Sequence, residues 1–335
     1  MMRIEESGSV RVDLLGGTLD LYPIGVFIPG SCTLNFATSL TARVALRKID
    51  GDLIVESLDY NTKKTFKSSE FTDLLIYGGH FGPLSLVAHI LRHFSVDRGV
   101  HLTLDSDSPP GAGLGGSSTM GVVLYKALCG LCKKEFDKTT AVLTVKDMEA
   151  CILQSPAGYQ DYYPALYGGI LGLHPVFGKV RVEQLYSKDL ADFIQENFTL
   201  VFSGASRLSG VNNWEVYKSF FNGDKKIRKG LTEIASLSHK ALLAIKKRKY
   251  KDLQPLVITE GECRKNLFSG IITEEINAFS KSLQKEVPTA GVKVCGAGGG
   301  GHFLVVHNDQ DGPKIEKIIS EANMKKVSFS IGTPL

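Results

Sequence analysis

The sequence predicts an α+β protein built from two consecutive segments that divide near residue 186. Alternating apolar runs typical of strands occur early in the chain, and a glycine-rich loop at residues 109–119 separates a strand from a helix. A second series of strand-like and helical runs begins near residue 186. With 335 residues, 43% of them hydrophobic, the chain can fill two cores. We therefore expect one domain over residues 1–185 and a second over residues 186–335.

The first segment begins with strands. Residues 44–58 hold two alternating runs around Asp50-Gly51, a dipeptide typical of hairpin turns, so we expect an antiparallel pair there. Residues 83–96 have helical periodicity, and residues 101–104 alternate like a strand that leads into the glycine loop. One more helix and two short strands are expected over residues 146–153, 171–176 and 179–185.

The second segment contains a second glycine run between two strands. Residues 292–295 and 302–307 have strand character and flank residues 296–301, which include five glycines. So many glycines leave few side chains to pack, and this is favourable where a backbone or a ligand must come close. We therefore interpret the run as functional. A strand ends at residues 201–202, and helices are expected over residues 232–245, 273–283 and 313–322.

The glycine loop reads Pro-Pro-Gly-Ala-Gly-Leu-Gly-Gly-Ser-Ser-Thr over residues 109–119. Its glycines allow backbone N–H groups to approach an anion closely. Apolar residues recur at helical spacing from Met120 to Leu131, so the helix should begin near Ser117 and direct its free N–H groups to the same anion. The hydroxyls of Ser117 and Ser118 can cap this helix or bind magnesium. The loop is therefore predicted to bind phosphate.

Other interpretations of this loop remain open on its residues alone. It can be a turn that caps the helix without a ligand. Residues 111–116 also match the G-x-G-x-x-G pattern of dinucleotide-binding folds, but that pattern requires an acidic residue after a buried strand about 20 residues on. Residues 133–138 are instead a charged stretch. A Walker A loop is excluded because no Gly-Lys-Ser/Thr closes the run and the next lysine is Lys126.

Two aspartates lie in glycine-rich surroundings. Asp20 follows the Gly16-Gly17 turn, where a carboxylate can accept hydrogen bonds from sugar hydroxyls. Asp161 lies among aromatic residues and glycines in residues 158–169. If an arginine keeps it ionised, Asp161 can accept the proton of an attacking hydroxyl during phosphoryl transfer. On the residues alone, ordinary turn aspartates explain both segments equally well.

Composition favours a small anionic ligand. The net charge of +4 is mild and scattered, which argues against nucleic acid as a partner. Neither a signal peptide nor a span of transmembrane length is recognisable, so we expect a cytoplasmic protein that does not use a membrane. The six cysteines lack disulfide spacing, and the pair Cys129 and Cys132 lies in an apolar helix, so we interpret both as core residues.

Together these segments resemble the GHMP kinases, the family of galactokinase, homoserine kinase, mevalonate kinase and phosphomevalonate kinase. The three motifs of that family match residues 11–20, 109–117 and 293–301 in order, with Gly116 in place of a serine. Within the family, the chain is most similar to bacterial D-glycero-D-manno-heptose 7-phosphate kinases, whose Gln-Asp-Gln-Tyr-Ala-Ala and Thr-Gly-x-x-Arg segments resemble residues 160–165 and 203–207. Tyr162 and Pro164 depart from that pattern, so the reaction type is better supported than the substrate.

The resemblance implies a ribosomal-protein-like N-terminal domain, a ferredoxin-like C-terminal domain and an active site in the cleft between them. It implies a kinase that uses ATP and magnesium to phosphorylate a sugar or sugar phosphate, with a heptose 7-phosphate as the best guess. Asp161 and Arg11 would be catalytic, and Ser117 and Glu149 would hold the magnesium. The ATP loop would comprise Pro110, Gly111, Ala112, Gly113, Leu114, Gly115, Gly116, Ser117 and Ser118, with the adenine in a nearby apolar groove. The substrate would contact Asp20, Gly17, Gln160, Tyr162, Arg207, Gly298 and Gly299.

Several other functions stay open. The substrate can instead be a neutral monosaccharide or another small alcohol, as in galactokinase or mevalonate kinase. The chain can also be an inactive relative that binds a sugar or a nucleotide. An NAD-linked oxidoreductase is disfavoured because the acidic partner of the dinucleotide pattern is missing. We expect a small-molecule partner only, with neither nucleic acid nor membrane, and a monomer or homodimer.

Overall fold

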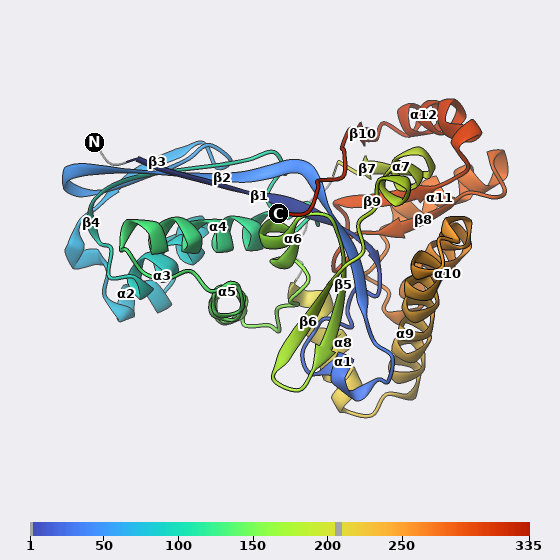
Figure 1. The fold of residues 1–335 in the computed structure, drawn as a ribbon, viewed down its shortest axis with the longest axis horizontal. Coiled ribbons are helices and arrows are strands. Elements are labelled where there is room, and N and C mark those ends of the chain that lie inside the picture. The colour runs from blue at the N-terminus through green and yellow to red at the C-terminus, as the bar shows by residue number, and fades with distance from the viewer. Residues whose placement is uncertain (1–2, 205–209) are drawn as a thin grey trace.

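A computed structural model describes residues 3–204 and 210–335, and it consists of two sheets with helices packed against them (Figure 1). The first sheet has six strands in this part of the chain, in the order β1-β2-β5-β6, with β3 and β4 also paired to β2. These strands are β1 (Arg3–Leu15), β2 (Thr33–Ser57), β3 (Thr62–Phe66), β4 (Arg98–Ser106), β5 (Ile170–Val176) and β6 (Lys179–Gln184).

The chain reverses at Gly51 as expected, but the two arms of β2 do not form the predicted hairpin pair. The first arm pairs with β1 on one side and with β4 on the other. The second arm pairs with β3 and with the same strand β4. Neither arm has a free edge for the other, because β4 lies between them. The Asp50-Gly51 signal predicts the turn, and tertiary packing decides the pairing.

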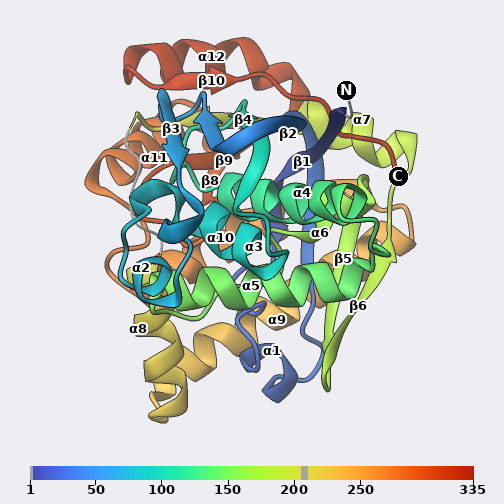
Figure 2. The ribbon, with the colours of Figure 1, turned by 90° about the vertical axis from the view of Figure 1, so that its left-hand side faces the viewer.

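Helices cover one face of the first sheet and enclose an apolar core (Figures 1 and 2). The predicted helix at residues 83–96 is confirmed as α3, and the helix after the glycine loop is α4. The helix expected over residues 146–153 is the second half of a longer one that begins after Asp137, whose side chain accepts a hydrogen bond from the Thr140 N–H. The helices of this part are α1 (Ile24–Phe27), α2 (Asp73–Tyr77), α3 (Ser85–His93), α4 (Gly116–Leu131), α5 (Lys138–Leu153) and α6 (Tyr163–Tyr167), and the 3-10 turns are Ser68–Glu70 and Gly82–Leu84.

The second half of the chain forms an antiparallel four-stranded sheet in the order β10-β7-β9-β8. Its strands are β7 (Phe198–Phe202), β8 (Gly291–Val294), β9 (His302–Val306) and β10 (Lys325–Val327). Helix α10 packs against both α9 and β8. The helices are α7 (Lys188–Asn197), α8 (Gly210–Phe221), α9 (Lys225–Lys246), α10 (Leu253–Leu267), α11 (Glu274–Glu286) and α12 (Gly312–Glu321), with 3-10 turns at Tyr250–Asp252 and Asp309–Asp311. The α+β class is confirmed.

The two sheets share a core. Apolar side chains of β1, such as Val12 and Leu14, belong to the same buried cluster as Leu200 of β7 and Leu304 of β9. The end of the chain returns to the first sheet, where Ile331 pairs with Thr38. The boundary near residue 186 therefore remains a prediction. No helix in the described ranges combines the length and apolar character needed to cross a membrane.

Candidate active site

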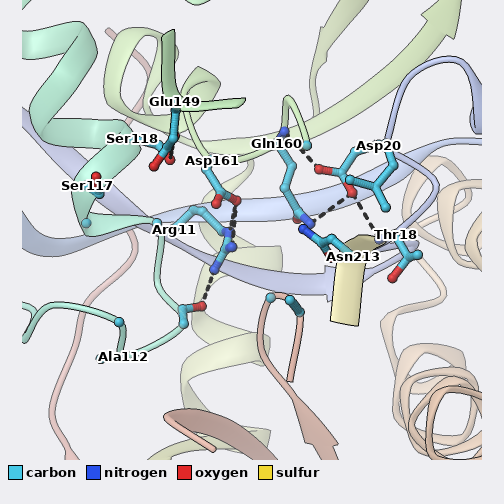
Figure 3. Close-up of a pocket in the computed structure, with 18 residues that line it drawn as sticks. Arg11, Thr18, Asp20, Ala112, Ser117, Ser118, Glu149, Gln160, Asp161 and Asn213 are labelled. Carbon is cyan, nitrogen blue, oxygen red and sulfur yellow. Dashed lines mark hydrogen bonds and ion pairs between the residues drawn. The ribbon is translucent and has the colours of Figure 1, made fainter. Parts of the chain in front are cut away.

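A polar pocket lies where the glycine loop, the end of β1 and the second glycine run meet (Figure 3). Residues from distant parts of the sequence converge there. We call it the polar pocket, and its lining residues are Arg11, Thr18, Asp20, Leu21, Gly111, Ala112, Gly113, Gly115, Gly116, Ser117, Ser118, Glu149, Gly158, Gln160, Asp161, Asn213, Gly296 and Ala297.

The glycine loop turns into α4 as the sequence predicts. Gly111, Gly113 and Gly115 have φ angles of 69°, 84° and 72°, in the left-handed region that favours glycine. Gly115 precedes the first helical residue, so the unpaired N–H groups of the first turn lie at the pocket. Leu114 points away from the pocket into the core and is fully buried, and its carbonyl accepts a hydrogen bond from the Arg11 N–H at 3.1 Å. The loop is thus fixed to β1 with its helix N-terminus toward the cavity.

The second glycine run packs its backbone directly against this loop. The Ala112 carbonyl accepts a hydrogen bond from the His302 N–H at 2.8 Å, and a Cβ on Gly301 would overlap that same carbonyl. A Cβ on Gly296 would lie 3.1 Å from the Gly113 carbonyl. The close approach expected of this run is therefore one of backbone against backbone.

Two glycines predicted to bind substrate lie elsewhere. Gly299 donates its N–H to the Ile271 carbonyl at 2.8 Å, and a Cβ on Gly298 would overlap that carbonyl. Neither glycine lines the polar pocket, whereas Gly296 and Ala297 of the same run do.

Arg11 and Asp161 form an ion pair across the pocket. The guanidinium donates from Nε and Nη2 to Asp161 Oδ1, at 2.8 and 2.5 Å, and Nη1 donates to the Gly113 carbonyl. The Arg11 side chain is 3% exposed, and that of Asp161 is 27% exposed. Burial opposes the charge on Arg11, but Asp161 and Asp13 outweigh it and raise its pKa. The predicted catalytic pair is therefore assembled, with the carboxylate open to the pocket.

Glu149, on α5, lies beside the first turn of α4. Ser118 Oγ donates a hydrogen bond to Glu149 Oε2 at 2.7 Å (Figure 3). The Tyr162 hydroxyl donates to the same oxygen at 2.5 Å. Burial raises the pKa of Glu149 above its usual value, and these hydrogen bonds oppose that shift, with a smaller contribution from Ser117. Ser117 itself is exposed.

The oxygens around Glu149 fit a magnesium ion. Magnesium prefers one or two carboxylate or hydroxyl oxygens and takes its remaining ligands from phosphate and water. Glu149 with Ser118 or Ser117 supplies such a set beside the helix N-terminus. Tyr162, predicted to contact substrate, is fully buried behind Glu149 and does not line the pocket. Its hydroxyl supports the carboxylate instead.

Asp20 lies at the other end of the pocket. It accepts hydrogen bonds from the Thr18 N–H at 2.9 Å and from the N–H and side-chain amide of Gln160 at 3.2 and 3.3 Å. Burial, reinforced by the negative charge of Asp161, raises the pKa of Asp20 to about 7. Asn213 of α8 reaches the same region (Figure 3). The sequence motifs did not single out Thr18 or Asn213. Thr18 follows the Gly16-Gly17 turn but carries no ionisable group, and Asn213 lies outside all three motifs.

Gly17 borders a buried charge cluster rather than the pocket. A Cβ on Gly17 would overlap the Asp13 carboxylate and the Arg264 guanidinium. Asp13 Oδ2 lies 3.1 Å from both Arg264 Nη1 and Lys293 Nζ, and Lys293 Nζ lies 3.6 Å from Glu260 Oε2. All four charged side chains are buried. Because they come from β1, α10 and β8, no local pattern in the sequence predicts this cluster.

An apolar groove adjoins the polar pocket. It shares Gly111, Gly116 and Ser117 with the pocket, so the two cavities meet at the glycine loop. Residues of α3 and α4 form part of its wall, and Pro110 also lines it. This is the position expected for an apolar adenine groove. Arg207, the remaining predicted substrate residue, lies outside the described residues.

The glycine loop, the helix N-terminus and the two adjoining cavities, set between two α+β units, define a protein with the GHMP kinase fold. Residues 83–169 match the model of the GHMP kinases N-terminal domain. This segment therefore carries a GHMP kinases N-terminal domain, and the chain as a whole has the fold of solved GHMP kinases.

Similar proteins include sugar kinases. The chain is 26% identical over 312 residues to D-glycero-alpha-D-manno-heptose 7-phosphate kinase of Campylobacter jejuni, covering 91% of this chain and 89% of that protein. It is 24% identical over 343 residues to L-fucokinase/L-fucose-1-P guanylyltransferase of Bacteroides fragilis, covering 93% of this chain but only 35% of that longer protein. A solved D-glycero-D-manno-heptose 1-phosphate kinase from Bacteroides thetaiotaomicron superposes with a TM-score of 0.75 at 18% identity, covering 99% of this chain and 97% of the other.

Proposed function

We propose that this protein transfers the γ-phosphoryl group of ATP to a hydroxyl of a sugar or sugar phosphate. The observation that carries the proposal is the Arg11–Asp161 pair, which faces the same pocket as the helix N-terminus of α4. A helix N-terminus binds phosphate through its free N–H groups, and a nearby carboxylate can accept a proton from an alcohol. Both requirements of phosphoryl transfer to a hydroxyl are therefore met within one cavity.

The nucleotide would lie across both cavities. We assign the base to the apolar groove and the triphosphate to the glycine loop, where the groove and the pocket share Gly111, Gly116 and Ser117. Magnesium would be held by Glu149 and by a hydroxyl of the Ser117-Ser118 pair. When bound, it would neutralise charge on the phosphate oxygens.

The acceptor hydroxyl would lie beside Asp161. As its oxygen bonds to the γ-phosphorus, the bond from that phosphorus to the bridging oxygen of ADP breaks, and the hydroxyl proton passes to Asp161. Arg11 holds the carboxylate in place and ionised, and its positive charge also stabilises charge that develops on the phosphoryl oxygens.

The far end of the pocket would bind the rest of the acceptor. Asp20 and Gln160 offer carboxylate and amide groups, which suit the hydroxyls of a sugar. A heptose 7-phosphate is the acceptor we favour, supported by the similarity to heptose kinases and by Arg207, which would pair with a substrate phosphate. Galactose, fucose, glucuronate and mevalonate are the alternatives.

A substrate panel tests the proposal. Purified protein with ATP and magnesium is offered each of these acceptors, ADP release is measured, and the product is identified by mass and phosphorus NMR. We expect turnover with a sugar or sugar phosphate only. An Arg207→Ala variant should lose a phosphorylated acceptor far more than a free sugar, and equal loss of both would remove the case for a phosphorylated substrate. Nucleotide binding without turnover of any acceptor would favour an inactive relative, and an NADH-linked absorbance change would favour an oxidoreductase.

A further inference from the structure

The apolar groove has polar groups in its lining that the proposed chemistry does not use. Its walls are largely aliphatic, with residues such as Leu84, Val87 and Leu124. The same lining includes Asp59, Ser106 and Ser108, which come from the turn after β2, the end of β4 and the loop that follows β4. A flat aromatic ligand held between aliphatic walls would present its polar edge to these groups.

Asp59 is fixed there by its neighbours. The Ser106 N–H donates to Asp59 Oδ1 at 2.7 Å, which orients the carboxylate. Within the described ranges, no hydrogen bond reaches the second oxygen, Oδ2. Close by, Ser108 is 4% exposed, and its hydroxyl has no hydrogen-bond partner in the same ranges. Buried polar groups are normally satisfied, so the Ser108 hydroxyl points to a ligand that completes its hydrogen bonds. Asp59 is half-buried, which leaves Oδ2 open to the same ligand.

We infer that Asp59 selects the base of the nucleotide by accepting a hydrogen bond from the exocyclic amine of adenine. An ionised carboxylate can only accept hydrogen bonds, so it matches the 6-amino group of adenine. The 6-keto group of hypoxanthine would place two acceptors face to face and leave both without a donor. This inference rests on the proposed nucleotide site and adds to it the residue that reads the base.

Nucleotide binding without an acceptor tests the inference. Magnesium-ATP and magnesium-ITP differ at position 6 of the purine. Isothermal titration of the wild-type protein with each of them gives the ratio of the ITP to the ATP dissociation constant. We expect ATP to bind about tenfold to a hundredfold more tightly, the range that a hydrogen bond to a charged group supplies. In Asp59→Asn the side-chain oxygen can still accept from Ser106 N–H, while the amide nitrogen would donate toward the base. The preference should therefore fall to near one or reverse.

Two controls keep the result specific. Asp105→Asn removes a nearby negative charge that pairs with Arg43 and lies outside the groove, so its ATP to ITP ratio should match that of the wild type. Thermal melting verifies that each variant is folded. An unchanged ratio in Asp59→Asn, or tighter binding of GTP than ATP by the wild type, overturns the assignment of Asp59 to adenine while leaving the kinase proposal intact. If the wild type binds none of these nucleotides, the proposed function fails, and the role of Asp59 fails with it.

Discussion

Arg11 donates two hydrogen bonds to one and the same oxygen of Asp161, from Nε at 2.8 Å and from Nη2 at 2.5 Å. Within the described ranges, no hydrogen bond reaches the second oxygen, and the Asp161 side chain borders the polar pocket. One oxygen is thus used for positioning, and the other is available to an acceptor hydroxyl. The two residues lie 150 positions apart in the sequence, so only the fold brings them together.

Asp161→Asn should abolish phosphoryl transfer while leaving nucleotide binding intact. Asparagine keeps the shape of the side chain but cannot take up the proton, and a positioned base typically contributes about a hundredfold or more to the rate. Turnover measured with the acceptor found in the panel, together with titration of ATP, checks both parts. Asp147→Asn, an exposed carboxylate on α5 that pairs with Lys146, is the matched control and should retain wild-type turnover. If Asp161→Asn retains turnover within about tenfold of the wild type, Asp161 is not the base.

The sequence predicts the local parts of this site better than their assembly. The left-handed glycines and the start of α4 follow from local conformational preferences, and both are found as predicted. The pairing of β2 with β4 and the buried position of Tyr162 depend on contacts between distant segments, which periodicity does not encode. For the same reason, no sequence pattern predicts the charge cluster around Asp13.

Removal of the serine hydroxyls should separate the two candidates for a magnesium ligand. We expect Ser118→Ala to raise the magnesium concentration needed for half-maximal turnover more than Ser117→Ala does, because Ser118 Oγ lies 2.7 Å from Glu149 Oε2 and Ser117 is exposed. Glu149→Gln should raise this magnesium concentration further. Magnesium titrations at saturating ATP provide the measurement. A larger effect of Ser117→Ala would restore the assignment that the sequence predicts, and no effect in any of the three variants would place the metal elsewhere.

Asp20 should make the protein less stable as the pH rises from about 4 to about 7. Its pKa is raised from 3.8 to about 7, so in this window the folded state retains a proton that the unfolded state has lost. The free energy of unfolding then falls with rising pH, by up to about 1.4 kcal/mol per pH unit, and levels off above pH 7. In Asp20→Asn this contribution is absent. Urea unfolding of both proteins from pH 4 to pH 8 gives the difference, and parallel curves would contradict the raised pKa.

Gly17→Ala should act on stability rather than on substrate binding. The added Cβ would overlap the Asp13 carboxylate and the Arg264 guanidinium, and displacing a buried ion pair costs on the order of 3 kcal/mol. Gly312→Ala is the matched control, because a Cβ there has no atom within 4 Å and should change stability by less than about 1 kcal/mol. Urea unfolding measures the stability of both variants. The KM of the folded variants for the acceptor tests the alternative, that Gly17 contacts the substrate. If Gly17→Ala raises that KM without loss of stability, Gly17 contacts the substrate as the sequence predicts, and the packing against Asp13 is not what requires a glycine.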